Sequence, residues 1–108
     1  MRAGDLRKRI TFQMRVTTKD ALGGQLGNWV DFATVWAEIR PLNSYELFRA
    51  QAIQSEISHE ITIRYVPGIT ASMRAVYNGR IFNLSPPMNT NERNIELVIP
   101  ATEGLNDG

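Results

Sequence analysis

The sequence predicts a mainly β protein: a small antiparallel β-barrel or sandwich of about six strands, with one short α-helix in a connecting loop. Two observations lead to this fold class. Several short segments alternate apolar with polar residues, which is the pattern of strands that bury one face. Residues typical of tight turns separate these segments, and an Asn78-Gly79 pair lies between two of them.

The first half of the chain predicts two strands joined by a loop. A strand is expected at 9–15, where apolar residues occupy every second position. The segment from Val16 to Asn28 holds three glycines and no long apolar stripe, so we expect a long exposed loop there. Residues 29–39 are apolar on both faces, which indicates a strand that is long, bent or covered on two sides. Pro41 is expected to close it.

One segment, residues 41–56, has a helical pattern. Asn43 or Ser44 can serve as the N-cap, and Glu46 stands at the capping-box position three residues after Asn43. Apolar side chains recur at helical spacing on one side only: Tyr45, Phe48 and Ala52. We therefore expect a helix of three turns or fewer that is marginal until something packs against it.

The second half predicts the remaining strands. Alternation returns at 58–66 and ends at a Pro67-Gly68 turn, and the Asn78-Gly79 hairpin is expected to join strands at about 72–77 and 80–85. A last strand should place Ile95, Leu97 and Ile99 on one side. Residues 4–100 are expected to form a single domain, followed by a flexible tail at 101–108.

Composition narrows the class of protein. The chain has 108 residues, an apolar fraction of 43% and a charged fraction of 21%, which are values of an ordinary globular domain. It lacks the apolar run of about 20 residues that crosses a bilayer, and its start lacks the apolar stretch of a signal peptide. We therefore expect the protein to be synthesised in a cytosol and not to associate with a membrane. Because the chain has no cysteine, disulfides and thiolate chemistry are excluded.

Charge is distributed unevenly although the net charge is only +1. The start of the chain is basic, and the region from Glu92 onward is acidic. This asymmetry has two interpretations. The first is a solvated surface that happens to be uneven. The second is a head-to-tail contact between copies, in which the basic part of one subunit meets the acidic part of its neighbour in a ring.

The sequence predicts no catalytic, cofactor or metal site. His59 is the single histidine, and it lies on the apolar side of its strand pattern, so we expect a packed or edge residue rather than a catalyst or ligand. The carboxylates are scattered, and no serine stands in a nucleophile-elbow context. The glycines at 23, 24 and 27 form neither a Walker loop nor a dinucleotide fingerprint. We therefore expect a protein that is not an enzyme.

A monomeric nucleic-acid-binding β-barrel module is the alternative function. Ten of the twelve basic residues are arginine, and small barrels bind single strands with basic and aromatic side chains. Against this reading, the net charge is close to zero, and nucleic-acid binders usually carry a broad basic stripe.

Four motifs occur in a fixed order: "VWAEIRPL", "HEITIRY", "GITASMR" and "YNGRIFNL". Together with "GDLRKRITFQ" at the start and an acidic closing strand, they resemble the head-tail joining (head-closure, or head-tail adaptor) proteins of tailed phages and prophages. The resemblance covers residues 4–99.

This resemblance implies a structural morphogenesis protein that joins the DNA-filled head to the tail. Copies would form a dodecameric ring below the portal complex, close the channel and offer a docking platform for the tail. The implied partners are other copies, the portal or portal-adaptor protein, a tail-terminator or tail-completion protein, and packaged double-stranded DNA. The location would be the virion head-tail connector after synthesis in the host cytoplasm, and a dilute free subunit could be monomeric.

By the same analogy, the connections between strands carry the function. The segment from Leu42 to Ser55 is the candidate channel-side element, with these polar residues: Asn43, Ser44, Glu46, Arg49, Gln51 and Gln54. The segment from Val16 to Asn28 is the candidate contact to another subunit or to the portal adaptor. The residues predicted to take part in such contacts are Arg7, Arg9, Lys19, Leu22, Leu26, Arg64 and Arg74.

Overall fold

The computed structural model describes residues 6–19, 25–52, 56–89 and 92–104. These ranges contain seven strands and one helix, so the predicted mainly β class is confirmed. In chain order the elements are β1 (Lys8–Lys19), β2 (Gln25–Pro41), α1 (Ser44–Gln51), β3 (His59–Arg64), β4 (Arg74–Tyr77), β5 (Arg80–Leu84), β6 (Met88–Asn89) and β7 (Glu96–Gly104).

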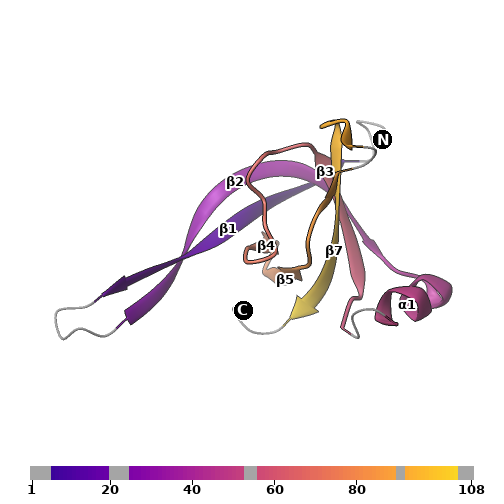
Figure 1. Ribbon diagram of the computed structural model, residues 1–108, viewed down its shortest axis with the longest axis horizontal. Coiled ribbons are helices and arrows are strands. Elements are labelled where there is room, and N and C mark those ends of the chain that lie inside the picture. The colour runs from indigo at the N-terminus through magenta and orange to yellow at the C-terminus, as the bar shows by residue number, and fades with distance from the viewer. Residues whose placement is uncertain (1–5, 20–24, 53–55, 90–91, 105–108) are drawn as a thin grey trace.

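The strands form one antiparallel sheet in the order β3-β2-β1-β4-β5-β7-β6, and β3 also pairs with β7 (Figure 1). This last pairing closes six strands into a barrel and leaves β6 as an extra strand on β7. Strand β7 completes the closure because its first part pairs with β3 and its last part with β5. Of the two predicted architectures, the barrel is therefore the correct one.

The barrel interior is filled by the apolar residues that the alternation pattern placed on one face. The largest fully buried side chains come from four strands, β1, β3, β5 and β7: Ile10, Phe12, Ile61, Ile63, Phe82 and Ile99. Full burial of a side chain of this size contributes about 1.5–3 kcal/mol of transfer free energy. This core stabilises the barrel without any contribution from α1, none of whose residues is buried.

The predicted loop from Val16 to Asn28 is wrong for its two ends. Strands β1 and β2 stay paired as far as Lys19 opposite Gln25, and only residues 20–24 lie outside the described residues. A ladder needs backbone groups in register rather than an apolar stripe, and Val16 and the two threonines after it favour extended backbone. The three glycines were therefore wrongly taken as evidence for a loop along the whole segment.

The outer part of this hairpin, residues 14–19 and 25–32, is called the arm below. Strand β4 pairs with β1 only from Thr11 to Gln13, so within the described residues the arm has no further strand neighbour. Figure 1 shows the arm projecting from the barrel along the longest axis of the molecule, with α1 at the other end of that axis. The arm makes the molecule elongated, with extents of 49 × 28 × 27 Å.

A β-bulge marks the base of the arm. The partner of Phe12 is Ala33 whereas the partner of Gln13 is Asp31, so Phe32 is an extra residue in β2. The bulge shifts the alternation of β2 by one position, which explains why residues 29–39 look apolar on both faces. The strand is long, as expected, but it is not covered on both sides, because Trp36 is 52% exposed.

The predicted turns are confirmed. Asn78 and Gly79 join β4 to β5 with φ of 50° and 82°, as a tight hairpin of this dipeptide requires. Gly68 in the Pro67-Gly68 turn has a φ of 92°, and a Cβ at this position would lie 3.0 Å from Cζ of Phe32. Glycine is needed there for its backbone conformation and for the close approach of this ring.

The boundary of the predicted tail at residue 101 is wrong. Strand β7 continues to Gly104, and Ala101 is fully buried between β3 and β5. Only residues 105–108 lie outside the described part of the chain. In the same region Leu97 and Ile99 point into the core as predicted, whereas Ile95 precedes the strand and is 56% exposed.

Candidate assembly surfaces

Helix α1 begins with the predicted capping box. The side chain of Asn43 accepts a hydrogen bond from the backbone N–H of Glu46 at 2.9 Å. In return, the backbone N–H of Asn43 donates to Oε1 of Glu46 at 3.1 Å. This reciprocal pair satisfies two of the N–H groups that a helix start leaves without a partner.

A clamp of Arg40, Glu46 and Glu60 holds this end of α1 to the barrel. The Arg40 guanidinium donates to both carboxylate oxygens of Glu46, at 2.7 and 2.9 Å, and to Oε1 of Glu60 at 3.1 Å. Hydrogen bonds from Arg40 and from the Asn43 backbone lower the pKa of Glu46 to about 2, and the two carboxylates raise the pKa of Arg40. Glu46 is therefore ionised and neutralised by its partner at physiological pH.

The rest of α1 is attached weakly. At its C-terminal end, the side-chain amide of Gln51 donates to the backbone carbonyl of Ile57 at 3.1 Å. The predicted apolar stripe is present but uncovered, since Tyr45 is 68% and Phe48 is 78% exposed. The position of α1 is thus set by polar bonds at its ends rather than by burial of a helix face.

The structure places the predicted channel-side residues in different roles. Asn43 and Glu46 make the cap and the clamp, and Gln51 bonds to Ile57. Ser44 is exposed, and the Arg49 guanidinium lies 5.7 Å from the ring centroid of Tyr45. Gln54 lies outside the described residues.

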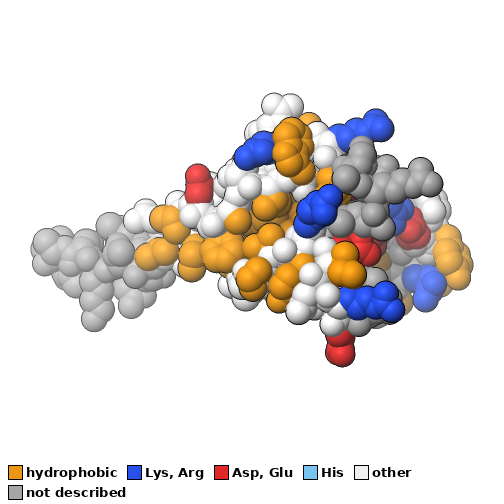
Figure 2. All heavy atoms as spheres, turned by 90° about the horizontal axis from the view of Figure 1, so that it is seen from above, with side chains coloured by type: hydrophobic (Ala, Val, Ile, Leu, Met, Phe, Trp, Pro, Cys, Tyr) orange, Lys and Arg blue, Asp and Glu red, His pale blue; other side chains and the backbone are white. Residues whose placement is uncertain are grey.

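The arm carries exposed apolar side chains on the face that continues the barrel interior. Met14 pairs with Val30 across the two strands, and Val16 follows on the same face. These three side chains, called the inner arm face below, are between 37% and 40% exposed. Figure 2 shows hydrophobic side chains running along the arm toward the body of the molecule. A surface that faces only water would carry mainly polar side chains at these positions.

The opposite, outer face of the arm and barrel combines tryptophan with arginine. The guanidinium of Arg74 lies 4.3 Å from the ring centroid of Trp29, and that of Arg15 lies 5.9 Å from it. Arg9 stands 5.3 Å from the centroid of Trp36 on the same face. These are cation–π distances.

Polar bonds fill the space between the two tryptophans, namely Thr11 with Thr34, Gln13 with Asp31, and Arg74 with Gln13. This surface was not predicted from the sequence. Arg9 and Arg15 lie on β1 and the tryptophans on β2, so the register that pairs Arg9 with Trp36 and Arg15 with Trp29 is needed to bring them together.

The predicted contact residues do not form one surface. Arg9 and Arg74 lie on the outer face just described, whereas Arg64 is exposed at the end of β3. The backbones of Lys19 and Leu26 belong to the arm ladder, and Leu22 lies outside the described residues.

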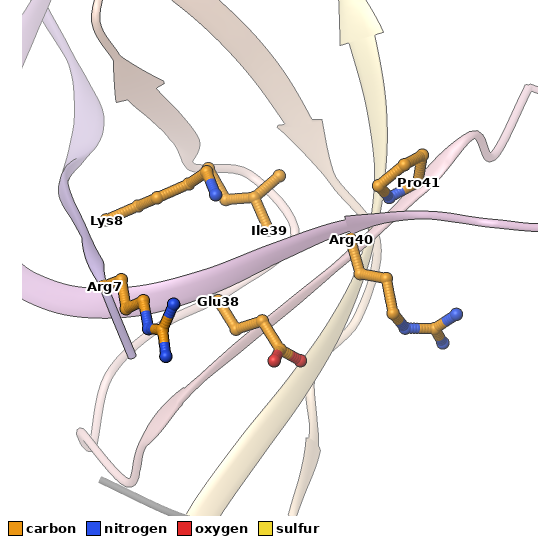
Figure 3. Close-up of a pocket in the computed structure, with 6 residues that line it drawn as sticks. All are labelled: Arg7, Lys8, Glu38, Ile39, Arg40 and Pro41. Atoms are coloured by element: carbon orange, nitrogen blue, oxygen red, sulfur yellow. The ribbon is translucent and has the colours of Figure 1, made fainter. Parts of the chain in front are cut away.

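Arg7 lies in a shallow groove of about 350 Å³ between the start of β1 and the end of β2. In Figure 3, Arg7, Glu38 and Arg40 project to one side of these strands and Ile39 and Pro41 to the other. The groove is mixed in charge, with one carboxylate among its basic side chains.

A second groove, of about 340 Å³, lies between α1 and the barrel. His59, Glu60 and Ser85 contribute to its wall, but its surface is mainly apolar. We call it the α1 groove, and its apolar lining is Leu42, Ala50, Ile57, Pro86, Met88 and Pro100. Met88, on the extra strand β6, is 53% exposed at this site.

Ser58, His59 and Glu103 come together at the junction of β3 and β7. The Ser58 hydroxyl bonds to Nδ1 of His59 at 2.8 Å and accepts the backbone N–H of Glu103 at 3.2 Å. Glu103 is bonded twice to Arg80, at 2.9 and 3.0 Å, and its carboxylate is 3.7 Å from Nε2 of His59.

Burial lowers the pKa of His59, which outweighs the opposing effect of the Glu103 carboxylate. The imidazole is packed edge-on against Phe82 at 5.3 Å between ring centroids. The serine and the carboxylate are thus engaged in bonds that fasten β3, β5 and β7 to one another.

The described residues contain no group of three histidine or acidic side chains placed to hold a metal ion. No helix among them is both long and apolar enough to cross a membrane.

Comparison with known proteins places this chain among phage proteins. The sequence profile of the phage head completion protein family matches residues 1–104. Head completion protein gp16 of Bacillus phage SPP1 is 36% identical over 72 residues, which span 67% of this chain and 66%, or about two thirds, of that relative.

Solved structures share the fold. Protein SF1141 from Shigella flexneri 2a superposes with a TM-score of 0.79 at 29% identity, covering 99% of this chain and 100% of that one. A chain in the virion of a native gene transfer agent particle superposes with a TM-score of 0.63 at 16% identity, covering 94% and 97%, and this likeness concerns the fold alone.

These matches extend over nearly the whole chain and agree with the resemblance stated from its motifs. They identify it as a structural phage protein of head-tail morphogenesis. The chain belongs to the phage head completion protein family.

Proposed function

We propose that copies of this protein form a ring below the portal complex after DNA packaging. The ring closes the channel against DNA escape and presents the platform on which the tail docks. One observation carries this proposal: the folded subunit leaves its arm and its helix uncovered at opposite ends of its longest axis (Figure 1). A subunit with two different uncovered ends suits a heterologous contact, which forms a ring when the rotation closes.

Helix α1 is the channel-side element in this proposal. It has no buried side chain, and polar bonds at its two ends hold it, so it can change position at little cost in apolar burial. Because Glu46 is neutralised by Arg40, its charge contributes little repulsion toward DNA. Obstruction of the channel would instead be steric, through the exposed rings of Tyr45 and Phe48.

Electron microscopy of lysates that lack this protein tests the proposal. We expect separate tails, together with heads that package DNA and then lose it. Supplying the intact chain from a plasmid should restore joined particles. Normal joined particles in its absence would contradict the proposal.

The outer face of the arm supports a second candidate function, binding of nucleic acid. Trp29 and Trp36 each lie at a cation–π distance from an arginine. Proteins that bind single strands use aromatic rings to stack on bases and basic side chains to contact phosphates. Titration of tryptophan fluorescence with single-stranded DNA at two salt concentrations tests this. Tight, salt-sensitive binding by a monomer that ignores the portal complex would favour the second function over the ring.

A further inference from the structure

We propose that the inner arm face of one copy packs into the α1 groove of the next copy, so that a single repeated arm-into-groove contact builds the ring. This inference rests on the ring of the proposed function. It adds the two surfaces that meet and identifies the occupant of the groove as a second copy of this chain.

The arm requires a cover. A two-stranded β-ribbon is marginally stable alone in water, and the arm has no other strand beside it within the described residues. Its inner face is also apolar where it leaves the barrel, with Met14 directly opposite Val30. Exposed ribbon edges and an exposed apolar face together are features that proteins normally bury against a partner.

The α1 groove has the matching chemistry. Its surface is mainly apolar, its volume of about 340 Å³ admits several side chains, and Met88 is half exposed at its rim. Burial of methionine and valine side chains from the arm would remove apolar surface from water on both partners. Tyr45 and Phe48 lie on the same helix and add exposed aromatic area next to the groove.

Geometry selects a second copy as the occupant. The arm and α1 lie at opposite ends of the longest axis, which measures 49 Å, so the arm of a folded subunit cannot reach its own groove (Figure 1). Each copy therefore offers one arm and one vacant groove. A contact between unlike surfaces repeats from copy to copy, as a ring requires, whereas arm-to-arm pairing would end at a dimer.

Charge favours the same orientation. Around Trp29, two arginines stand against one carboxylate: Arg15 and Arg74 against Asp31. At the α1 end, three carboxylates stand against two arginines: Glu46, Glu56 and Glu60 against Arg40 and Arg49. Arg15 and Arg74 lie on the outer face of the arm and barrel, outside the contact itself, so the opposite signs act at a distance by steering one copy toward the α1 end of another.

Cysteine cross-linking tests the contact without cross-links from native thiols of this chain, because the chain contains no cysteine. Val30→Cys places a thiol on the arm and Met88→Cys places one at the groove, both at exposed positions. Particles carrying either single variant or the double variant are treated with a short bismaleimide reagent. We expect a ladder of covalent multimers from the double variant and only monomers from the single variants.

Three results would overturn the inference. Dimers from Val30→Cys alone would show arm-to-arm pairing, and a link from Val30→Cys to another virion protein would give the arm a different partner. Intact, fully reacted particles without a ladder would show that the two surfaces do not meet. In each case the ring could still be seen by electron microscopy, whereas failure of the proposed function appears as normal joined particles without this protein.

A charge substitution provides a second test. Val30→Asp should raise the protein concentration needed for half-maximal assembly by about tenfold, the effect of losing one apolar anchor worth about 1.4 kcal/mol. Ile95→Asp is the matched control, because Ile95 is also a β-branched, exposed residue but lies outside the arm and the groove. Equal loss of assembly in both variants, with unchanged monomer melting, would contradict the specific contact.

Discussion

The barrel and helix α1 use the same kinds of side chain in opposite ways. Phe82 is fully buried among the strands, whereas Phe48 on α1 is 78% exposed. The barrel closes on itself and buries its own apolar residues, while α1 is positioned by an arginine clamp and a capping box. The difference shows that burial gives the barrel its stability, whereas directional polar bonds give α1 its place and leave its apolar residues exposed.

The largest expected effect contrasts these two phenylalanines. Phe82→Ala should lower the free energy of unfolding by about 3–5 kcal/mol, because it removes a fully buried ring and leaves a cavity. Phe48→Ala should change it by less than about 0.5 kcal/mol, as for an exposed residue. Urea denaturation of both variants measures the contrast. Similar losses would show that α1 shares the barrel's core.

The turns at Gly68 and Gly79 allow a second comparison, between a glycine in contact with a side chain and one without such a contact. Gly68→Ala should destabilise the fold by about 2 kcal/mol, because φ is 92° and the new Cβ would meet the Phe32 ring. Gly79→Ala should cost about 1 kcal/mol, because its φ is also positive but nothing lies within contact of the Cβ.

Thermal melting of the two glycine variants checks their order. Combining Gly68→Ala with Phe32→Ala should cost less than the sum of the two separate changes, because the clash disappears. If the losses of stability from the two changes simply add, the phenyl ring of Phe32 plays no part in the cost of Gly68→Ala.

For the clamp, Glu46→Gln should release α1 while leaving the barrel intact. The substitution removes a charge-assisted, two-bond contact with Arg40, so amide hydrogen exchange in α1 should speed up several-fold with little change in melting temperature. Glu56→Gln, at an exposed glutamate that follows α1 and is outside the clamp, is the control. Unchanged exchange in α1 would mean that the clamp does not hold it.

The same clamp predicts acid sensitivity. The folded-state pKa of Glu46 is about 2, below the ordinary value of 4.5, so its contribution is present above pH 4.5 and is lost as pH falls toward 2. The protection of α1 amides, measured relative to their intrinsic exchange rates at each pH, should therefore fall in that range before the barrel unfolds, and Glu46→Gln should flatten this response.

The smallest effect is expected from His59. Burial lowers its pKa in the folded state from 6.5, so the unfolded chain binds more protons as pH falls below that value. The stabilisation is complete above pH 6.5 and is lost as pH falls through the folded pKa. Urea midpoints measured on both sides of pH 6.5 should differ in the wild type and converge in His59→Gln. An unchanged difference in the variant would assign it to another group.

Local signals predicted local structure. The capping box of Asn43 and Glu46 and the Asn78-Gly79 hairpin are written within a few residues, and both are present. The arm was missed because pairing of β1 with β2 depends on register rather than on an apolar stripe. The clamp was missed for the same reason, since Arg40 meets Glu60 through the pairing of β2 with β3.

Strand β2 has a mechanical consequence. It is one uninterrupted strand of 17 residues that starts in the arm, crosses the barrel wall and ends two residues before the helix cap at Asn43. A force on the arm at Gln25 would therefore be carried along the backbone of β2 to the start of α1. In the ring proposed above, capture of an arm by a neighbour would therefore act on the helix of the same copy through the backbone of β2.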